Sequence, residues 1–258
     1  MKLTVMTFNL RVNTPIDGIH IWPNRSDRVI EAIKEADPDI IGTQEGTLAM
    51  LKDVDEGLPE YRRFGRGRLD SGQEETDEFC AVYYKKDLFQ IIEEGQFWLS
   101  ETPDTPGSVS WDSSLPRICS WALLASRMQP DQLFYIYNTH YDHLGQQARE
   151  ESSRLLIEHI AAHTGKDNVP FILTGDFNAE PSNKALAMLH NSFQSAYSTI
   201  DAPPGRTFHG YLGGHDGEPI DFIFASQNIQ LLSAYVDTKQ RNHGFPSDHY
   251  AVIAKVGI

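Results

Sequence analysis

The sequence predicts one domain of mixed helices and strands, in which two similar halves precede a β-rich tail. The chain has 258 residues, which is within the range of a single large sandwich or α/β domain. Hydrophobic residues make up 40% and aromatic residues 10%, enough to bury a sizeable core. A strand–helix–strand pattern occurs twice, and no linker is long enough to separate two domains. We therefore treat residues 1–258 as one domain.

The first half is predicted to open on a strand at residues 2–10, where KLTVMTFNL alternates and is rich in strand formers. Apolar residues then recur at helical spacing over residues 25–36, with Asn24 or Ser26 as the cap. A short buried strand, DIIGTQE, follows and ends at Glu45. The remainder is predicted as a weaker helix at 48–55, strands at 79–84, 88–100 and 118–126, and a loop at 101–117.

The second half repeats this pattern with a strand (LFYIYNTH), a helix at residues 146–163 and a buried strand (FILTGDF). The strands of the first copy end at Asn9 and Glu45, and those of the second at His140 and Asp176. Both pairs are 36 residues apart (45 − 9 and 176 − 140). The repeat indicates two related halves that meet at a shared site, with chance spacing as the alternative. Strands are predicted in the tail at residues 218–226, 229–237 and 247–256.

The charge and cysteine content exclude several classes of protein. With 22 Lys and Arg against 36 Asp and Glu, the net charge of −14 weighs against an extended grip on nucleic acid. Cys80 and Cys119 lie outside any zinc-binding pattern and are expected to be buried in a reducing compartment. No apolar run approaches the ~20 residues that span a bilayer, and the N-terminus has the pattern of a strand rather than a signal peptide. The expectation is a cytoplasmic protein with no transmembrane segment and no obligate protein partner.

Polar residues stand at the end of almost every predicted strand. Each has a structural explanation by itself, such as a turn or a helix cap, but together they are typical of a site on a rigid sheet. Carboxylate and amide oxygens without thiolates suit Mg²⁺ or Mn²⁺, and histidines beside carboxylates suit proton transfer or phosphate binding. The chain has no phosphate-binding loop of the GxxxxGK[ST] type and no GxSxG serine. Metal-assisted hydrolysis of a phosphate ester is therefore predicted, and its candidate residues are Asn9, Glu45, His140, Asp142, Asp176, Asn178, Asp221, Asp248 and His249.

Six ordered motifs carry a resemblance to a known family: TFNL, QE, NTH, GDFN, IDFIF and SDHYAV. They run from Thr7 to Val252 and resemble the endonuclease/exonuclease/phosphatase family, which includes deoxyribonuclease I. The stretch FWLSETPDTPGSVSWDSSLPRICSWA also resembles an uncharacterised bacterial subgroup of this family. The resemblance implies an α+β fold, a four-layer α/β/β/α sandwich with two mostly antiparallel sheets flanked by helices. It places the site at one edge of the sandwich.

The resemblance also implies how the metal and the attacking water are held. Glu45 matches the main metal-binding glutamate of the family, with Asn9 beside it. Asp248 matches a residue near the metal. Asp176 matches the aspartate that orients or deprotonates the attacking water, and Asn178 matches a donor to a phosphate oxygen.

Further roles concern the histidines and their partners. By resemblance, Asp221 pairs with His249, and His140 binds phosphate or protonates the leaving oxygen. Glu78 is expected to support His140, and Asp142 is a further supporting carboxylate. Arg117 is a candidate phosphate clamp, because a guanidinium meets phosphate oxygens through two hydrogen bonds; a salt bridge is the alternative.

The function predicted from these residues is that of a Mg²⁺-dependent phosphoesterase, in which activated water attacks a phosphodiester or phosphomonoester in line. The substrate is either small or lipid-linked, or a nucleic acid. The alternative is an exonuclease or endonuclease on RNA or DNA, similar to a deadenylase, and a non-catalytic binding module on the same fold is a further one. The loop YRRFGRGR either guides a polyanion or is solvated. The sequence leaves open whether His249 acts as a cation or as a neutral base.

Overall fold

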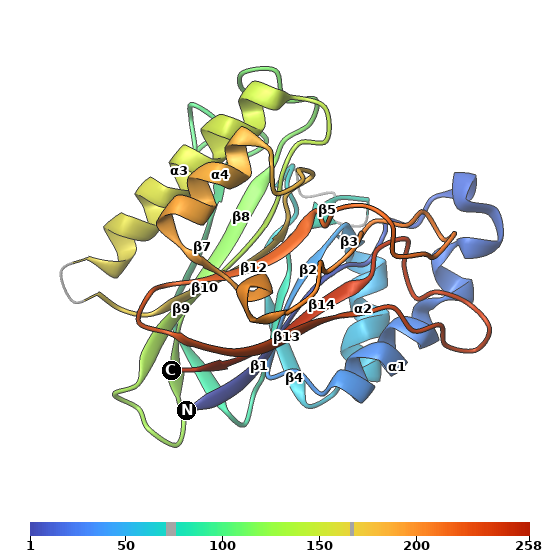
Figure 1. Cartoon of the computed structure of the whole chain (residues 1–258), viewed down its shortest axis with the longest axis horizontal. Coiled ribbons are helices and arrows are strands. Elements are labelled where there is room, and N and C mark those ends of the chain that lie inside the picture. The colour runs from blue at the N-terminus through green and yellow to red at the C-terminus, as the bar shows by residue number, and fades with distance from the viewer. Residues whose placement is uncertain (71–75, 166–167) are drawn as a thin grey trace.

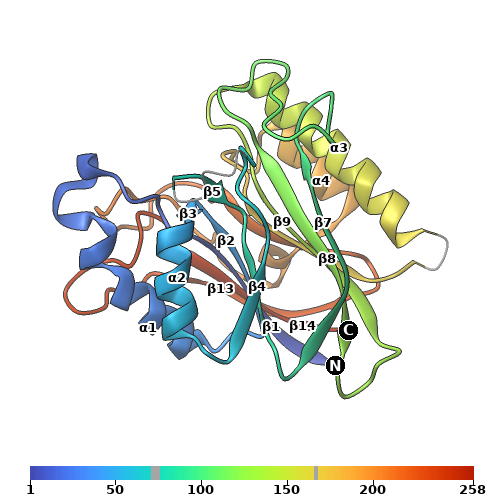
Figure 2. The same ribbon diagram turned by 180° about the vertical axis from the view of Figure 1, so that it is seen from behind.

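The computed structural model describes residues 1–70, 76–165 and 168–258, which form a four-layer sandwich. Two mixed sheets of six strands pack face to face, and helices cover their outer faces (Figures 1 and 2). Helices α1 (Ser26–Ala36) and α2 (Leu48–Gly57) lie on one side, and α3 (Gln146–Thr164) and α4 (Lys184–Ser192) on the other. None of the helices within the described ranges is both long and apolar enough to cross a membrane. The predicted architecture of two sheets between helices is confirmed.

The first sheet has the order β13-β14-β1-β2-β6-β4. Only β1 and β2 pair in parallel in it, and the other neighbours are antiparallel. The chain crosses from β1 to β2 through the short 3₁₀ helices η1 and η2 and then α1. The bounds are β1 Lys2–Asn9, β2 Ile40–Gln44, β4 Tyr61–Phe64, β6 Val82–Lys85, β13 Gln230–Asp237, β14 Ala251–Gly257, η1 Pro15–His20 and η2 Trp22–Asn24.

The second sheet has the order β11-β12-β10-β9-β8-β7, and here only β9 and β10 pair in parallel. Helix α3 crosses between them, as α1 does between β1 and β2. The bounds are β7 Phe89–Trp98, β8 Ile118–Ser126, β9 Leu133–His140, β10 Phe171–Asp176, β11 Gln194–Ser195 and β12 Asp221–Ala225, and the chain also forms η3 Ala196–Thr199 and a small sheet of β3 Gly46–Thr47 with β5 Glu78–Phe79.

The core has three layers because each strand places alternate side chains on opposite faces of its sheet. On β1, Leu3 and Val5 face the second sheet, whereas Met6 and Phe8 face α1 and α2. On β10, Ile172 faces the first sheet and its neighbours pack under α3 and α4. Sheets that are covered on both faces need apolar residues at successive positions, which explains the continuous apolar runs in the sequence.

The two strand–helix–strand units bring their polar strand ends to one edge of the sandwich. In β9 and β10 the parallel register places His140 opposite Asp176. In β1 and β2 it places Asn9 opposite Gln44, and Glu45 follows directly. The Asn9 Nδ2 atom donates hydrogen bonds to Glu45 Oε1 at 2.8 Å and to Asp176 Oδ2 at 2.9 Å, which joins the two units. The strand ends that share the 36-residue spacing therefore meet at one edge of the sandwich.

Several elements differ from the prediction. The single strand expected at residues 79–84 is divided into β5 and β6, because Cys80 and Ala81 lie between two different sheets. Strand β14 begins at Ala251, so His249 precedes the last strand rather than opening it. Neither predicted residue caps α1; Arg25 holds that position and makes no side-chain cap hydrogen bond. Two elements were not predicted: β4, an edge strand with two arginines, and α4, which Asn183 caps by accepting a hydrogen bond from the Ala185 N–H.

Candidate active site

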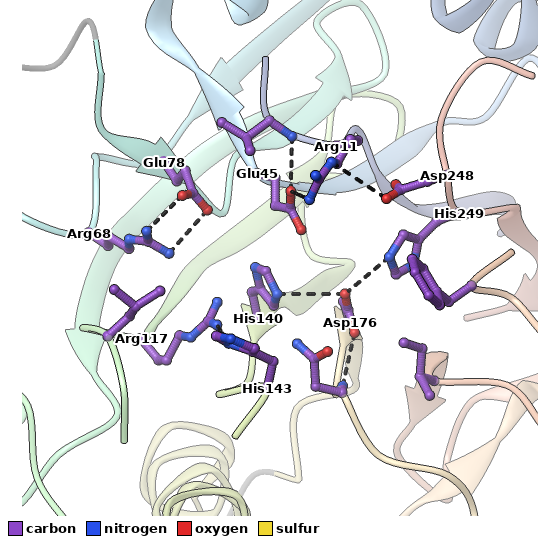
Figure 3. Close-up of a pocket in the computed structure, with 15 residues that line it drawn as sticks. Arg11, Glu45, Arg68, Glu78, Arg117, His140, His143, Asp176, Asp248 and His249 are labelled. Carbon is purple, nitrogen blue, oxygen red and sulfur yellow. Dashed lines mark hydrogen bonds and ion pairs between the residues drawn. The ribbon is translucent and has the colours of Figure 1, made fainter. Parts of the chain in front are cut away.

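A pocket of about 340 Å³ opens at the edge where the polar strand ends meet. Figure 3 shows acidic, imidazole and guanidinium groups pointing into it from both sheets. Three predicted residues do not line the pocket but lie behind it: Asn9 contacts Glu45, Asp221 contacts His249, and Asp142 contacts Arg117. The predicted residues that do line it are Glu45, Glu78, Arg117, His140, Asp176, Asn178, Asp248 and His249.

Asp176 is the residue on which the pocket converges. It ends β10 and is 1% exposed. Its Oδ2 atom lies 3.6 Å from the Nε2 atom of His140 and 3.8 Å from that of His249 (Figure 3). Its Oδ1 atom accepts a hydrogen bond from the Asn178 N–H at 2.9 Å. Burial, with the nearby charge of Asp221, raises the pKa of Asp176 to about 7, so its carboxylate can exchange a proton near neutral pH.

His249 and Asp221 form a buried imidazole–carboxylate pair. Strand β12 runs antiparallel to β10 and places Asp221 opposite Asp176. The Asp221 Oδ2 atom lies 2.9 Å from Nδ1 of His249, which leaves Nε2 directed toward Asp176. Burial lowers the pKa of His249, but the carboxylates of Asp221 and Asp176 outweigh it and raise that pKa to about 10. His249 is therefore a cation at neutral pH, and the predicted pairing with Asp221 is present.

His140 has the opposite electrostatic environment. It ends β9 next to Asp176 and is 7% exposed. Burial and the positive charges of Arg117 and Arg68 hold the pKa of His140 well below its usual range. One imidazole of the pocket is thus neutral and the other charged, although both approach the same carboxylate.

Glu45 is the most suitable residue to hold a metal ion. Its side chain is 13% exposed to the pocket, and its oxygens accept hydrogen bonds from Asn9 and from the Val12 N–H at 2.9 Å. Burial opposes ionisation, but these two hydrogen bonds lower the pKa of Glu45. Ligand atoms of Glu45, His140 and Asp176 lie within 4.8 Å of one another. A set of two carboxylates and one imidazole fits a divalent cation.

Asp248 lies across from Glu45, with the guanidinium of Arg11 between them. The Arg11 Nε atom is 3.6 Å from Asp248, and its Nη1 atom is 3.9 Å from Glu45. Two bonds of 2.9 Å fix the same guanidinium to Asp17 on η1. Burial raises the pKa of Asp248. The family resemblance implies that Asp248 lies near the metal. In the structure the Arg11 guanidinium connects Asp248 to the Glu45 carboxylate.

Arg117 and Glu78 occupy the side of the pocket away from His249 (Figure 3). Arg117 lies 3.5 Å from Asp142 Oδ2 and 3.1 Å from Nδ1 of His143, so it makes a salt bridge and still lines the pocket. The Glu78 carboxylate accepts two hydrogen bonds from Arg68, at 3.0 and 2.7 Å. The expected support of His140 by Glu78 is therefore replaced by an ion pair with Arg68.

Seven residues that line the pocket were not among the predicted site residues: Arg11, Val12, Arg68, Leu115, His143, Phe208 and Ile220. Two lie close to a family motif, since Arg11 directly follows TFNL and His143 follows NTH by three positions. The others lie in loops or before a strand, where no periodic pattern distinguishes them. The ring of Phe208 lies 5.1 Å from that of His249, so it forms the wall on that side.

Three pocket residues have left-handed backbone angles, with φ of 56° at Arg11, 62° at Glu45 and 46° at Asn178. Non-glycine residues with such angles cost on the order of 1 kcal/mol or more and are common at functional sites. At Asn178 this turn brings the backbone N–H back onto Asp176 and lets Nδ2 donate to the Tyr141 carbonyl at 3.0 Å. The backbone thus directs the polar groups that follow β2 and β10 into the pocket.

Comparison with solved structures identifies close relatives of the whole chain. An endonuclease/exonuclease/phosphatase family protein from Bacteroides thetaiotaomicron is 35% identical, with a TM-score of 0.92 over 99% of this chain and 95% of that one. A mannosyl-6-phosphatase from Bacteroides thetaiotaomicron is also 35% identical, with a TM-score of 0.91 over 99% of this chain and 100% of that one. Both similarities extend through all four layers.

Among curated proteins the chain is similar to nocturnin. The nocturnin of Xenopus laevis is 23% identical over 264 residues, which cover 90% of this chain and 64% of that protein. The chain spans between 41% and 64% of the length of the nocturnins that it matches. Residues 6–249 match the Endonuclease/Exonuclease/phosphatase family. This chain therefore belongs to the endonuclease/exonuclease/phosphatase family, and its fold and pocket agree with that assignment.

Proposed function

We propose that this protein is a divalent-cation-dependent phosphoesterase that acts on a small phosphate ester. The observation that carries the proposal is the position of Asp176, whose Oδ2 atom lies within 4 Å of one neutral and one cationic imidazole and beside Glu45. A buried carboxylate that exchanges protons near neutral pH is suited to activate water, and a neighbouring cation is suited to stabilise phosphate charge. Membership of a family of phosphoesterases and nucleases supports this reading.

Glu45 would hold the cation, either Mg²⁺ or Mn²⁺, with Asp248 nearby. When bound, the cation would neutralise a phosphate oxygen and so supply charge stabilisation. In this arrangement Asn9 positions the carboxylates of Glu45 and Asp176, because its amide donates a hydrogen bond to each. The carboxylate–imidazole set that contains Asp221 is less suited to a metal, since the Asp221 oxygen that faces His249 is already bonded to it.

The side chains divide the remaining work by their charge. Asp176 orients the attacking water and takes a proton from it. His249, held by Asp221, donates from Nε2 to a phosphate oxygen as a cation. His140 is neutral and contacts either the leaving oxygen or a phosphate oxygen. The side-chain amide of Asn178 has a second N–H, which is suited to donate a hydrogen bond to another phosphate oxygen. Losing one such preorganised group costs about 10²–10³ in rate.

Two features support a small ester over a long nucleic acid. The pocket of about 340 Å³ suits a small molecule. The arginines of YRRFGRGR are also largely neutralised, since Arg63, Arg66 and Arg68 pair with carboxylates at 3.0, 2.8 and 2.7 Å. A segment with three of its four arginines already paired has few free charges left to neutralise the phosphates of a polyanion. The likeness to a mannosyl-6-phosphatase agrees with this preference.

A substrate panel with Mg²⁺ or Mn²⁺ tests the proposal. It includes hexose 6-phosphates, p-nitrophenyl phosphate, inositol phosphates, sphingomyelin and single-stranded poly(A) RNA. We expect hydrolysis of a small ester, loss of activity in EDTA and recovery with excess cation. Glu45→Gln should raise the cation concentration needed for half-maximal rate, with Glu56→Gln, an exposed carboxylate on α2, as the matched control. Full turnover in a chelated sample would refute metal dependence, and preferred cleavage of RNA would favour the nuclease alternative.

A further inference from the structure

One wall of the pocket carries two guanidinium groups, and we name it the guanidinium wall: Arg68 and Arg117. Figure 3 shows these side chains together on the side of His140 that faces away from His249. Phe208 belongs to the other side, where its ring contacts His249. The two sides of the pocket therefore differ. Guanidinium groups, each paired with a carboxylate, lie on one side of Asp176, and an apolar surface lies on the other.

The guanidinium wall is held in place before any ligand binds. Arg117 is 4% exposed and is fixed by Asp142 and His143. Arg68 is held by its two hydrogen bonds to Glu78. Among the described residues, the Arg117 hydrogen bonds use only Nε and Nη2, which leaves Nη1 for a ligand. Rigid guanidinium groups lose little conformational freedom when they bind phosphate oxygens.

Next to the guanidinium wall there is almost no space. A cavity of about 10 Å³ lies between the two arginines and the side chains of Glu45 and His140, and Cys80, Pro116 and Ile118 close it. Such a volume accommodates about one water molecule. This side of the pocket can therefore receive a phosphate oxygen but not a second organic substituent.

We infer that the guanidinium wall makes this protein a phosphomonoesterase, selective for a terminal phosphate over a phosphodiester. The inference rests on the proposed function and specifies its substrate class. A monoester carries one more negative charge than a diester above its second pKa of about 6, and one substituent fewer. The extra charge meets the guanidinium wall, and the single substituent leaves along the side of Phe208. In the net reaction the water oxygen bonds to phosphorus, the ester P–O bond breaks, and the leaving oxygen gains a proton, which yields an alcohol and inorganic phosphate.

The test compares two substrates with one leaving group, p-nitrophenyl phosphate and methyl p-nitrophenyl phosphate, in Mg²⁺ buffer. We expect the wild type to prefer the monoester. Arg117→Gln should lower kcat/KM for the monoester about tenfold or more, as expected for the loss of a charged hydrogen bond, and change the diester rate far less. Arg66→Gln removes an exposed arginine that pairs with Asp70 outside the pocket, and it is the matched control.

Glu78→Gln tests the sign of the effect. It removes the carboxylate that neutralises Arg68, so inorganic phosphate should bind more tightly, whereas Arg117→Gln should weaken its binding. Calorimetry with inorganic phosphate measures both without turnover, so it separates this inference from the proposed function. Arg117→Lys keeps the charge and serves if Arg117→Gln does not fold. A wild-type preference for the diester, an unchanged monoester-to-diester ratio in these variants, or phosphate affinities that do not move in opposite directions would overturn the inference.

Discussion

Asp176 shows how single residues acquire their chemistry from their neighbours. Its carboxylate lies between an imidazole that stays neutral, His140, and one that stays charged, His249. Burial and two nearby arginines lower the pKa of His140, whereas two carboxylates next to His249 outweigh the effect of burial there. The same residue type therefore serves two purposes within one pocket, because the pKa of each histidine is set by the charges around it.

The pairing of Asp221 with His249 predicts strongly non-additive kinetics. Asp221→Asn should lower kcat/KM by about the same factor as His249→Ala, about 10²–10³, because both remove the same positioned cation. The double variant should be scarcely slower than either single one, since residues that act as one unit are not additive. Steady-state kinetics of the three variants on one substrate measure this. Losses that multiply would show that the two residues act independently.

The raised pKa of His249 also predicts how stability depends on pH in EDTA. The folded-state pKa is about 10, against about 6.5 in an unfolded chain. The folded protein therefore binds more protons than the unfolded one between these values. The stabilisation from this group is complete below about pH 6.5 and is lost as the pH rises through about 10. Melting curves should show a falling Tm over this window, and His249→Gln should make the fall shallower; equal slopes would contradict the shift.

At the level of elements, the turn between β9 and α3 is organised by one carboxylate. Asp142 Oδ1 accepts hydrogen bonds from the N–H groups of Leu144 and Gly145, and Oδ2 accepts bonds from Ser114 and approaches Arg117. The side chain is 1% exposed. The Asp142 carboxylate therefore connects three parts of the chain: the start of α3, the long loop before β8 and the guanidinium wall.

Asp142→Ala should lower the free energy of unfolding by about 3–5 kcal/mol, because it leaves the buried guanidinium of Arg117 without its charge partner. Asp142→Asn should recover part of this loss by keeping hydrogen bonds to the backbone. Chemical denaturation measures both, with Asp131→Ala, an exposed carboxylate in the turn before β9, as the control. A loss no larger than that of the control would show that the carboxylate does not stabilise this turn.

At the level of the whole molecule, a buried polar network joins the inner faces of the two sheets beneath the pocket. Asn138 on β9 accepts hydrogen bonds from Gln44 at 2.7 Å and Thr174 at 3.0 Å, and it donates to the Thr43 carbonyl at 2.8 Å. Gly42 on β2 leaves the room for it. A Cβ atom at Gly42 would lie 2.1 Å from the Thr174 hydroxyl oxygen. The spacing of the sheets, and hence of the two halves of the pocket, depends on this contact.

Gly42→Ala should therefore force the sheets apart locally. We expect a loss of about 1–3 kcal/mol in the free energy of unfolding, the usual cost of an overpacked core. Activity should fall as well, since Glu45 lies three residues after Gly42, directly beyond the end of β2. The control is Gly257→Ala on β14, where a Cβ atom meets its nearest neighbour at 3.6 Å. Equal stability of the two variants would show that the sheets tolerate the added atom.

Much of this arrangement could be predicted from local patterns. Alternation and apolar runs located most strands, because a strand covered on both faces needs apolar residues at successive positions. The 36-residue spacing related Asn9 to Glu45 and His140 to Asp176, because parallel strands of similar units end at the same edge. Strand β4 and helix α4 were missed, since an edge strand with two arginines and a short helix carry weak patterns.

The sequence by itself determined that polar strand ends would form one site and that oxygen and imidazole groups would supply its chemistry. Only the tertiary structure decided that Arg68 takes Glu78 away from His140, that Arg11 lies between Glu45 and Asp248, and which histidine is charged. The physical reason is the distance along the chain between the residues that interact. The residue types at a strand end follow from local pattern, whereas an ion pair or a pKa depends on which side chains the packing of both sheets brings within a few ångströms.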